Sequence, residues 1–292
     1  MSLRAGAATG AHPACGHVCL SFDFDGPSLW IQRRQTDPTS VSRGEFGAVA
    51  VPRILDLLTR RNLTATFFVP GHTAETYPNV VRAISDAGCE LALHGYAHEL
   101  NSRLDTPTER GLLERCTEVL AAVTGSPPVG YRAPSGVVTD QTLELLVEAG
   151  LRYDSSLMGH DYRPYRVRVG TGIPEDGPVR WGTETSLIEL PWSWTVDDYV
   201  HLEFVAFPRM LMPGLRSPVE MFANFSGDVR WMVDHVDRGV ATFVFHPQVI
   251  GRGHRLRALE AWLDELADLG VSFDRMDAIA AAVADGQVFG RE

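Results

Sequence analysis

Two carboxylates stand two residues apart where an apolar stretch of the sequence ends. They are Asp23 and Asp25 of SFDFDG (21–26), and Pro27 follows directly. In a β-strand, residues i and i+2 face the same side, so the two carboxylates are expected side by side at the end of a strand. Like charges this close raise each other's pKa unless a positive group lies between them. The alternative is an ordinary strand end, with one aspartate capping the turn and the other solvated.

A pair of histidines could bind a cation, the positive group that two neighbouring carboxylates need between them. His94 and His98 belong to HGYAH (94–98), which ends the apolar stretch CELALHG (89–95). Among ten histidines an H-x-x-x-H pair is weak on its own, because chance often produces one. Two histidines and one carboxylate from 21–26 form the ligand set of catalytic Zn²⁺ and of non-haem iron. The sequence therefore predicts one divalent ion, for which we favour Zn²⁺; the alternative is a pair of core histidines.

Further ionisable residues end other apolar stretches. They are Arg132 in VGYRAP (129–134), Asp154 in LRYDSS (151–156), Glu189 in SLIELPW (186–192) and His246 in ATFVFHP (241–247). A single residue of this kind is usually a cap or part of a solvated rim. Several strands that end in the same way indicate one shared site. We expect His246 across the mouth of a closed barrel from the first strand.

Short apolar stretches alternate with helical patterns along the chain. Strands are expected at 18–24, 64–70, 89–95, 129–134, 151–156, 186–192, 241–247 and 271–276, and helices near 48–61, 75–87, 107–124, 140–149, 217–238 and 254–269. A capping box is expected to open the helix at Ser217, with Pro218 in its first turn. The alternation predicts an α/β fold, a closed or nearly closed (β/α) barrel of seven to eight parallel strands. We expect one domain over 1–292, with 1–16 as an N-terminal extension.

Composition excludes several classes of partner. The chain has 292 residues, is 45% hydrophobic and carries a net charge of −11, so a nucleic-acid partner is not expected. The N-terminus lacks the apolar stretch of a secretory signal, and no stretch approaches the length of a membrane span, which predicts a cytoplasmic protein without a membrane partner. The four cysteines contain no C-x-x-C pair and are expected to be reduced and mostly buried. A homo-oligomer is left open.

Five motifs, SFDFDG, HGYAH, RAPSG, YDSS and FVFHP, occur in this order and with spacings that resemble the polysaccharide deacetylase (NodB-homology, carbohydrate esterase 4) family. The resemblance spans 17–276 and implies a deformed (β/α) barrel. It also implies that Asp23 is the catalytic base, that Asp25, His94 and His98 bind the metal, that Arg132 holds Asp23, that Asp154 and Ser155 line a groove wall, and that His246 protonates the leaving group. A metal that neutralises Asp25 would let Asp23 stay ionised beside it.

One departure concerns the first motif. The family commonly has adjacent aspartates, whereas Phe24 separates them here. This arrangement resembles an intracellular branch that contains cyclic-imide hydrolases and allantoinase-like and peptidoglycan-deacetylase-like proteins. Some members of that branch work without metal. Because both histidines and Asp25 are present, a metal is still expected.

The substrate is the least determined part of the prediction. Four aromatic residues, Trp30, Trp192, Trp194 and Tyr199, are candidates for the wall of a sugar pocket, although such residues more often lie in the core. We assign Trp30, Trp192, Asp154, Ser155 and Glu189 to substrate binding. The preferred function is metal-dependent hydrolysis of a non-peptide C–N bond, most simply N-deacetylation of a small or polymeric N-acetylated carbohydrate. A cyclic imide hydrolase is the alternative; a catalytically silent carbohydrate-binding barrel is disfavoured because base, acid and ligands are all present.

Overall fold

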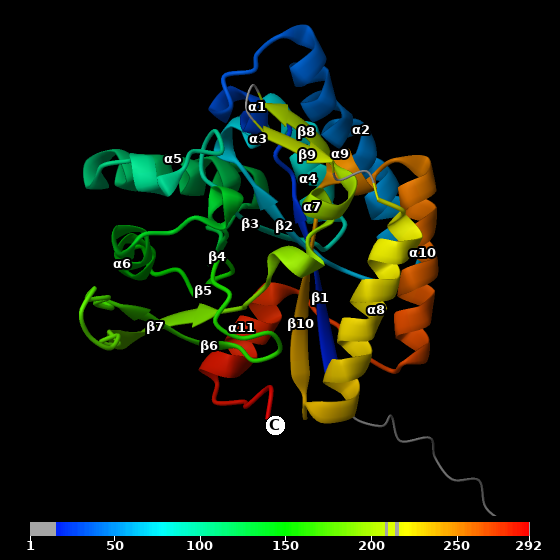
Figure 1. Ribbon diagram of the computed structural model, residues 1–292. Helices are drawn as coiled ribbons and strands as arrows, with labels where there is room; N and C mark the ends of the chain where they lie inside the picture. Colours follow the sequence, from blue (N-terminus) through cyan, green and yellow to red (C-terminus); the bar gives the residue numbers. More distant parts are fainter. Residues whose placement is uncertain (1–15, 208–209, 214–215, 292) are drawn as a thin grey trace, which may run out of the picture.

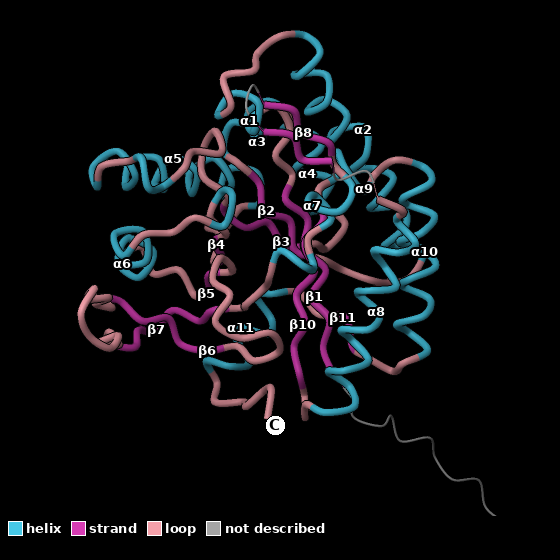
Figure 2. Tube along the Cα trace, in the orientation of Figure 1, coloured by secondary structure: helices cyan, strands magenta, loops and turns pink. Residues whose placement is uncertain are grey.

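The computed structural model describes residues 16–207, 210–213 and 216–291, with the backbone alone for 204–207 and 210–213. Its main feature is a curled sheet of nine strands with helices around it (Figures 1 and 2). The strands of this sheet are β1 (Gly16–Asp23), β2 (Thr66–Val69), β3 (Glu90–Leu93), β4 (Gly130–Tyr131), β5 (Tyr153–Asp154), β6 (Tyr165–Val169), β7 (Thr183–Glu189), β10 (Gly239–Phe245) and β11 (Ser272–Phe273). A separate antiparallel pair consists of β8 (Phe204–Phe207) and β9 (Met210–Pro213).

The strand order is β10-β1-β2-β3-β4-β5-β7-β6, with β11 also paired to β1. Every pairing in this sheet is parallel except that of β6 with β7. Eight strands therefore run in one direction, which confirms the predicted parallel (β/α) architecture. Parallel strands joined by helical crossovers bring their carboxyl ends to one edge of the sheet.

Helices surround the sheet, with α5 and α6 on one side and α2, α8 and α10 on the other (Figure 1). The longer helices are α2 (Pro38–Arg60), α4 (Pro78–Asp86), α5 (Thr106–Thr124), α6 (Asp140–Glu148), α8 (Pro218–His235), α10 (Gly253–Asp268) and α11 (Met276–Ala284). The shorter ones are α1 (Ser28–Gln32), α3 (Gly71–Thr76), α7 (Asp198–Leu202) and α9 (Pro247–Ile250), and the 3₁₀ turns are η1 (Asn101–Arg103), η2 (Pro134–Gly136) and η3 (Trp194–Val196).

The two faces of β1 pack into different layers. Val18, Leu20 and Phe22 belong to the larger apolar cluster that includes residues of the surrounding helices. Cys19, on the other face, belongs to a smaller cluster that includes residues of α11. Further along that second face come Ser21 and Asp23, so it changes from apolar to polar toward the carboxyl end of the strand. The polar end is where the functional site lies.

The sheet does not close into a complete barrel. It ends at β10 on one side and at β6 on the other, and these two strands are not paired. One backbone hydrogen bond links Val240 of β10 to the segment before β6, from the N–H of Val240 to the carbonyl of Tyr162 (2.9 Å). Because β10 is hydrogen-bonded directly to β1, His246 lies beside the end of β1. The expectation that it lies across the mouth from the first strand is wrong.

Two local predictions also need correction. The predicted helix near 75–87 is two helices, α3 and α4, and Pro78 begins the second. Proline suits the first turn of a helix but interrupts an interior, which explains the division. Ser217 does precede α8, but its side chain makes no capping hydrogen bond, so the predicted capping box is absent.

Candidate active site

The ionisable residues predicted at strand ends lie at the carboxyl ends of the parallel strands. Asp23 ends β1, and Asp25 follows two residues later on the same face. His94 follows β3, Arg132 follows β4, and His246 follows β10. Phe24 points the other way, into the larger apolar cluster. Strand alternation thus directs both aspartates inward while the intervening phenylalanine anchors the turn.

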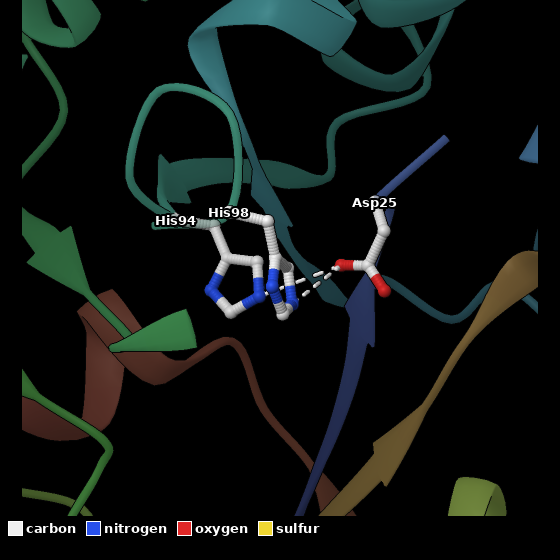
Figure 3. A group of neighbouring side chains, drawn as sticks. All are labelled: Asp25, His94 and His98. Atoms are coloured by element: carbon white, nitrogen blue, oxygen red, sulfur yellow. Dashed lines mark ion pairs between the residues drawn. The ribbon is translucent and has the colours of Figure 1, made fainter. Parts of the chain in front are cut away.

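Asp25, His94 and His98 converge on one point (Figure 3). The Oδ1 atom of Asp25 lies 3.5 Å from Nε2 of His94 and 3.7 Å from Nε2 of His98. All three side chains are buried, and their ligand atoms lie within 4.8 Å of one another. Ligand bonds of about 2.0–2.2 Å to a common centre are compatible with this spacing.

The turn between the histidines has an unusual backbone. Gly95 and His98 both have positive φ, 66° and 61°, and the Glu99 carboxylate accepts the backbone N–H groups of Tyr96 (2.9 Å) and Ala97 (2.8 Å). A positive φ is uncommon for a residue other than glycine and is found where the surroundings impose it. The turn therefore carries His98 back toward His94 without a helix.

The protonation of this trio favours a cation at its centre. Burial lowers the pKa of His98 to about 4, although Asp25 opposes the shift, so its imidazole is neutral near pH 7. Burial works against charge on His94, but Asp23 and Asp25 together raise its pKa. Burial also opposes ionisation of Asp25, but the neighbouring His98 and His94 outweigh it and hold the pKa of Asp25 below the ordinary value. An ionised carboxylate among buried imidazoles requires a proton or a metal beside it.

Hydrogen bonding leaves the ligand atoms of this trio available. His94 Nδ1 donates to the carbonyl of Arg132 (2.8 Å), which leaves Nε2 with its lone pair directed at Asp25. Asp25 Oδ1 is buried and has no hydrogen-bond partner among the described residues. A buried carboxylate oxygen without a partner is costly, and a metal ion would satisfy it. The three residues therefore form a site that can bind a metal.

Arg132 fixes the position of Asp23. Its Nη1 donates to Asp23 Oδ1 (2.7 Å) and to Ser21 Oγ (2.9 Å), and its Nε donates to the carbonyl of Ser155 (3.0 Å). The guanidinium is 1% exposed and Asp23 is 4% exposed. A charge-assisted hydrogen bond from a buried arginine holds the carboxylate in one orientation. Asp23 Oδ2, which lies 3.8 Å from His94 Nε2, is the oxygen that remains directed toward the metal site.

His246 is held by two aspartates that the sequence analysis did not identify. Its Nδ1 donates to Asp198 Oδ1 (2.8 Å), and its backbone N–H donates to both oxygens of the same carboxylate. Asp197 Oδ1 lies 3.8 Å from Nδ1. Burial opposes charge on His246, but Asp197 and Asp198 outweigh it and raise its pKa to about 10. The adjacent aspartates of WTVDDYV (194–200) were a visible signal for this pair.

Gln248 is a further residue that sequence reasoning missed. Its Nε2 donates to Asp25 Oδ2 (3.1 Å), the oxygen that does not face the histidines. Gln248 is 5% exposed and lies in α9, two residues after His246. This bond orients the carboxylate so that Oδ1 faces the two imidazoles.

These groups open onto a cavity of about 650 Å³. Asp23, Asp25, His94, His98 and His246 all line it, with Arg132 beside them. Trp192, Trp194 and Tyr199, three of the four aromatic candidates, form aromatic parts of the wall. The cavity is thus lined by both aromatic and ionisable side chains, which is usual for small-molecule sites.

Four residues assigned to substrate binding do not line this cavity. Asp154, Ser155 and Glu189 have no exposed surface, and Trp30 is 2% exposed. Ser155 instead accepts from Arg132 Nη2 through its Oγ (2.9 Å), and the Glu189 carboxylate accepts the backbone N–H groups of Ser156 (3.0 Å) and Leu157 (2.9 Å). Burial raises the pKa of both Asp154 and Glu189. The prediction that these four residues contact the substrate is therefore wrong. Ser155 supports Arg132, Glu189 supports the backbone that follows β5, and Trp30 packs against Arg33.

Comparison with known proteins places the chain among its relatives. Residues 12–153 match the family model described as polysaccharide deacetylase. A peptidoglycan deacetylase of Helicobacter pylori is 33% identical over 80% of this chain and 84% of its own length. The peptidoglycan deacetylase-like protein FGM2 of Gibberella zeae is 31% identical over 87% of this chain and 81% of its own. The chain belongs to the polysaccharide deacetylase family. It is therefore a hydrolase of the deacetylase type, and the predicted resemblance is confirmed.

Solved structures agree with this assignment. A crystal structure from Mycobacterium smegmatis, whose name puts it among the polysaccharide deacetylases, is 34% identical, has a TM-score of 0.81 and aligns over 99% of this chain and 97% of its own. The allantoinase Puue has a TM-score of 0.77 at 20% identity, over 94% and 92% of the two chains, and this likeness shows the fold alone. Within the residues described here, no helix has the length and apolarity needed to span a bilayer.

Proposed function

We propose that this protein is a Zn²⁺-dependent N-deacetylase of an N-acetylated sugar. Relatives named as a peptidoglycan deacetylase and a chitooligosaccharide deacetylase support the substrate class. The observation that carries the proposal is the convergence of three kinds of group on one cavity: a metal-binding trio, an arginine-held carboxylate and a protonated histidine. Two histidines, one aspartate and open positions suit catalytic zinc. Reduced, buried Cys19, Cys89 and Cys116 agree with the proposed cytoplasmic location.

Asp23 is the proposed general base. A divalent metal held by Asp25, His94 and His98 would supply Lewis-acid chemistry, lowering the pKa of water from about 15.7 toward 7 and polarising the amide carbonyl. Arg132 occupies Asp23 Oδ1, which leaves Oδ2 on the side of the metal site to accept the proton. Because Arg132 is itself held by Ser21 and Ser155, the carboxylate keeps one orientation. A base held in one orientation requires little reorganisation during the reaction.

His246 is the proposed general acid. Its Nδ1 is bonded to Asp198, so the proton available to substrate is on Nε2. With a pKa of about 10, this imidazole is protonated throughout the neutral range. Transfer of that proton to the amide nitrogen lets the amine leave as the C–N bond breaks. The aromatic side chains of Trp192 and Trp194 offer apolar surface for the sugar ring on the same cavity.

The cyclic imide alternative is not favoured, because the named relatives that align with most of this chain are deacetylases. The test uses protein stripped of metal with a chelator and then given Zn²⁺, assayed for acetate release from N-acetylglucosamine oligomers and for opening of succinimide. We expect Zn²⁺-dependent acetate release and little imide hydrolysis. Imide hydrolysis without acetate release would overturn the proposed substrate class, and full activity in the stripped protein would overturn the metal requirement.

A further inference from the structure

The charges that line the active cavity are opposite in balance to those of the whole chain. The chain carries a net charge of −11. The cavity is lined by three aspartates, against four arginines (Arg33, Arg34, Arg103 and Arg132) and the protonated His246. A divalent metal would add further positive charge. A cavity with such a balance attracts anions, because low-dielectric walls concentrate its field.

The carboxylates in the cavity are already engaged. Asp23 pairs with Arg132, Asp25 faces the two metal-site histidines, and Asp197 lies beside His246. None of the three forms an ion pair with Arg34 or Arg103 in the described part of the chain. These three carboxylates therefore do not neutralise the positive charge of Arg34 and Arg103.

Arg34 and Arg103 enter the cavity from two different loops at the carboxyl ends of the strands. Arg34 follows α1, with a positive φ of 57°, and Arg103 ends η1. Both are exposed, and within the described residues no carboxylate pairs with either. Among the described residues some exposed arginines have such partners, as Arg110 has with Glu148 (2.6 Å), and others, such as Arg82, have none. What distinguishes Arg34 and Arg103 is that both line the active cavity.

Arg33 is a third cation on this side, and it is held in place. Its Nη1 donates to the hydroxyl of Tyr199 (2.9 Å), and its guanidinium lies 5.2 Å from the centre of the Trp30 ring. This contact gives buried Trp30 a role behind the cavity wall. Guanidinium groups match carboxylate and phosphate oxygens through paired N–H donors, so the three arginines suit an anionic group on the substrate.

We infer that the substrate of this site is an N-acylated sugar that bears an anionic substituent, a carboxylate or a phosphate, and that Arg34 and Arg103, with Arg33 behind them, bind that substituent. The inference rests on the proposed function and narrows its substrate class. The anion would lie at the exposed end of the cavity while the acyl amide reaches Asp23 and the metal-binding trio. Neutral N-acetylated sugars would bind through the aromatic wall alone.

The experiment compares three sugars on the Zn²⁺-loaded protein: N-acetylglucosamine, N-acetylmuramic acid, which adds a carboxylate, and N-acetylglucosamine 6-phosphate. We expect kcat/KM to be at least about tenfold higher for a charged sugar at low salt, and the advantage to shrink as NaCl is raised. Arg34→Gln and Arg103→Gln should each lower the charged-to-neutral ratio by about tenfold, mainly through KM. Arg82→Gln is the matched control, an exposed arginine of α4 away from the cavity, and it should leave the ratio unchanged.

The outcomes separate this inference from the proposed function. A preference for only one charged sugar identifies the anion as carboxylate or phosphate and supports the inference. Equal kcat/KM for all three, with acetate still released, overturns the inference and leaves the deacetylase function standing. If no sugar is hydrolysed, the proposed function fails, and calorimetric titration of the same sugars decides the inference. Tighter binding of a charged sugar that is lost in both variants supports it, whereas equal or absent binding overturns it.

Discussion

Two clusters of aspartate and histidine face the same cavity, and they differ in how their polar atoms are satisfied. In the first, Asp25 Oδ1 has no hydrogen-bond partner and lies 3.5 and 3.7 Å from two imidazole nitrogens. In the second, His246 Nδ1 is 2.8 Å from Asp198, whose two oxygens also accept the backbone N–H of His246. The first cluster directs three potential ligand atoms toward one point, whereas the second pairs the ring Nδ1 and the backbone N–H of His246 with a carboxylate.

The histidines of the two clusters consequently hold protons differently. Burial lowers the pKa of His98 to about 4, and its Nε2 lone pair is available to a metal. His246 is also buried, but Asp197 and Asp198 overcome the effect of burial and raise its pKa to about 10. Residue types alone therefore do not define a metal site. The first cluster is suited to a cation, and the second is suited to carrying a proton.

The largest expected effect comes from separating the roles of the two neighbouring aspartates. Asp23→Asn should lower kcat by about 10⁴-fold, the upper end of what a general base supplies, because an amide cannot accept the proton. Its metal content should stay near that of the wild type, since Asp23 is not one of the three ligands. Asp25→Asn is the matched change and should weaken metal binding itself. Metal content is measured by elemental analysis of the folded variants. Equal metal loss in both would show that Asp23 also binds the metal.

Removal of the proposed acid should have the next largest effect. His246→Ala should lower amide turnover by about 10²–10³-fold and leave metal binding intact. The loss should be smaller for an activated aryl acetate, whose leaving group departs without a proton. Turnover of both substrates by wild type and variant, measured side by side, makes this comparison. If ester and amide lost the same factor, His246 would position the substrate or stabilise the oxyanion instead.

A smaller effect is expected from the residue that orients the metal-ligand carboxylate. Gln248→Leu removes the donor to Asp25 Oδ2 and should weaken Zn²⁺ binding by about 10–100-fold, as is usual for partners of metal ligands. Gln32→Leu is a suitable control, because Gln32 lines the cavity without a hydrogen bond to Asp25. Competition with a zinc chelator measures both affinities. An unchanged affinity in Gln248→Leu would show that α9 does not orient the ligand.

The smallest effect at neutral pH should come from the partner of His246. The folded state raises the pKa of His246 to about 10, so the protonated acid is lost only as the pH rises through that value. Asp198→Asn removes one of the charges that raise it, and the alkaline limb of kcat should move to lower pH. Asp228→Asn, a change at a carboxylate bonded to Tyr162, provides the control. If the alkaline limb of kcat stayed at the same pH in Asp198→Asn, His246 would not be the proton donor.

How far the sequence could predict the site depended on the range of the contacts involved. Asp23, His94 and His246 were predictable because parallel strands bring their carboxyl ends to one edge, and each residue ends an apolar stretch. Gln248 acts through Asp25, 223 residues away in the sequence, and no local pattern reports such a contact. Trp30 and Glu189 showed the reverse problem. Their types suited a binding wall, but packing buried them behind it, and only the structure reveals which side of a strand end faces the cavity.

The edge of the fold was also hard to predict from periodicity. The short antiparallel strand β6 pairs with β7 and leaves the sheet open toward β10. Its sequence, YRVRV, alternates arginine with apolar residues, which is typical of a half-exposed edge strand and not of a buried barrel strand. The buried parallel strands, by contrast, were visible as continuous apolar stretches.

The contrast between the two clusters can be tested most directly by anomalous diffraction at the zinc absorption edge, on crystals grown with Zn²⁺. We expect one peak, about 2.0–2.2 Å from Asp25 Oδ1, His94 Nε2 and His98 Nε2. We expect no peak between Asp197, Asp198 and His246. A peak at that second cluster, or no peak at the first in crystals whose protein contains one zinc per chain, would contradict this contrast.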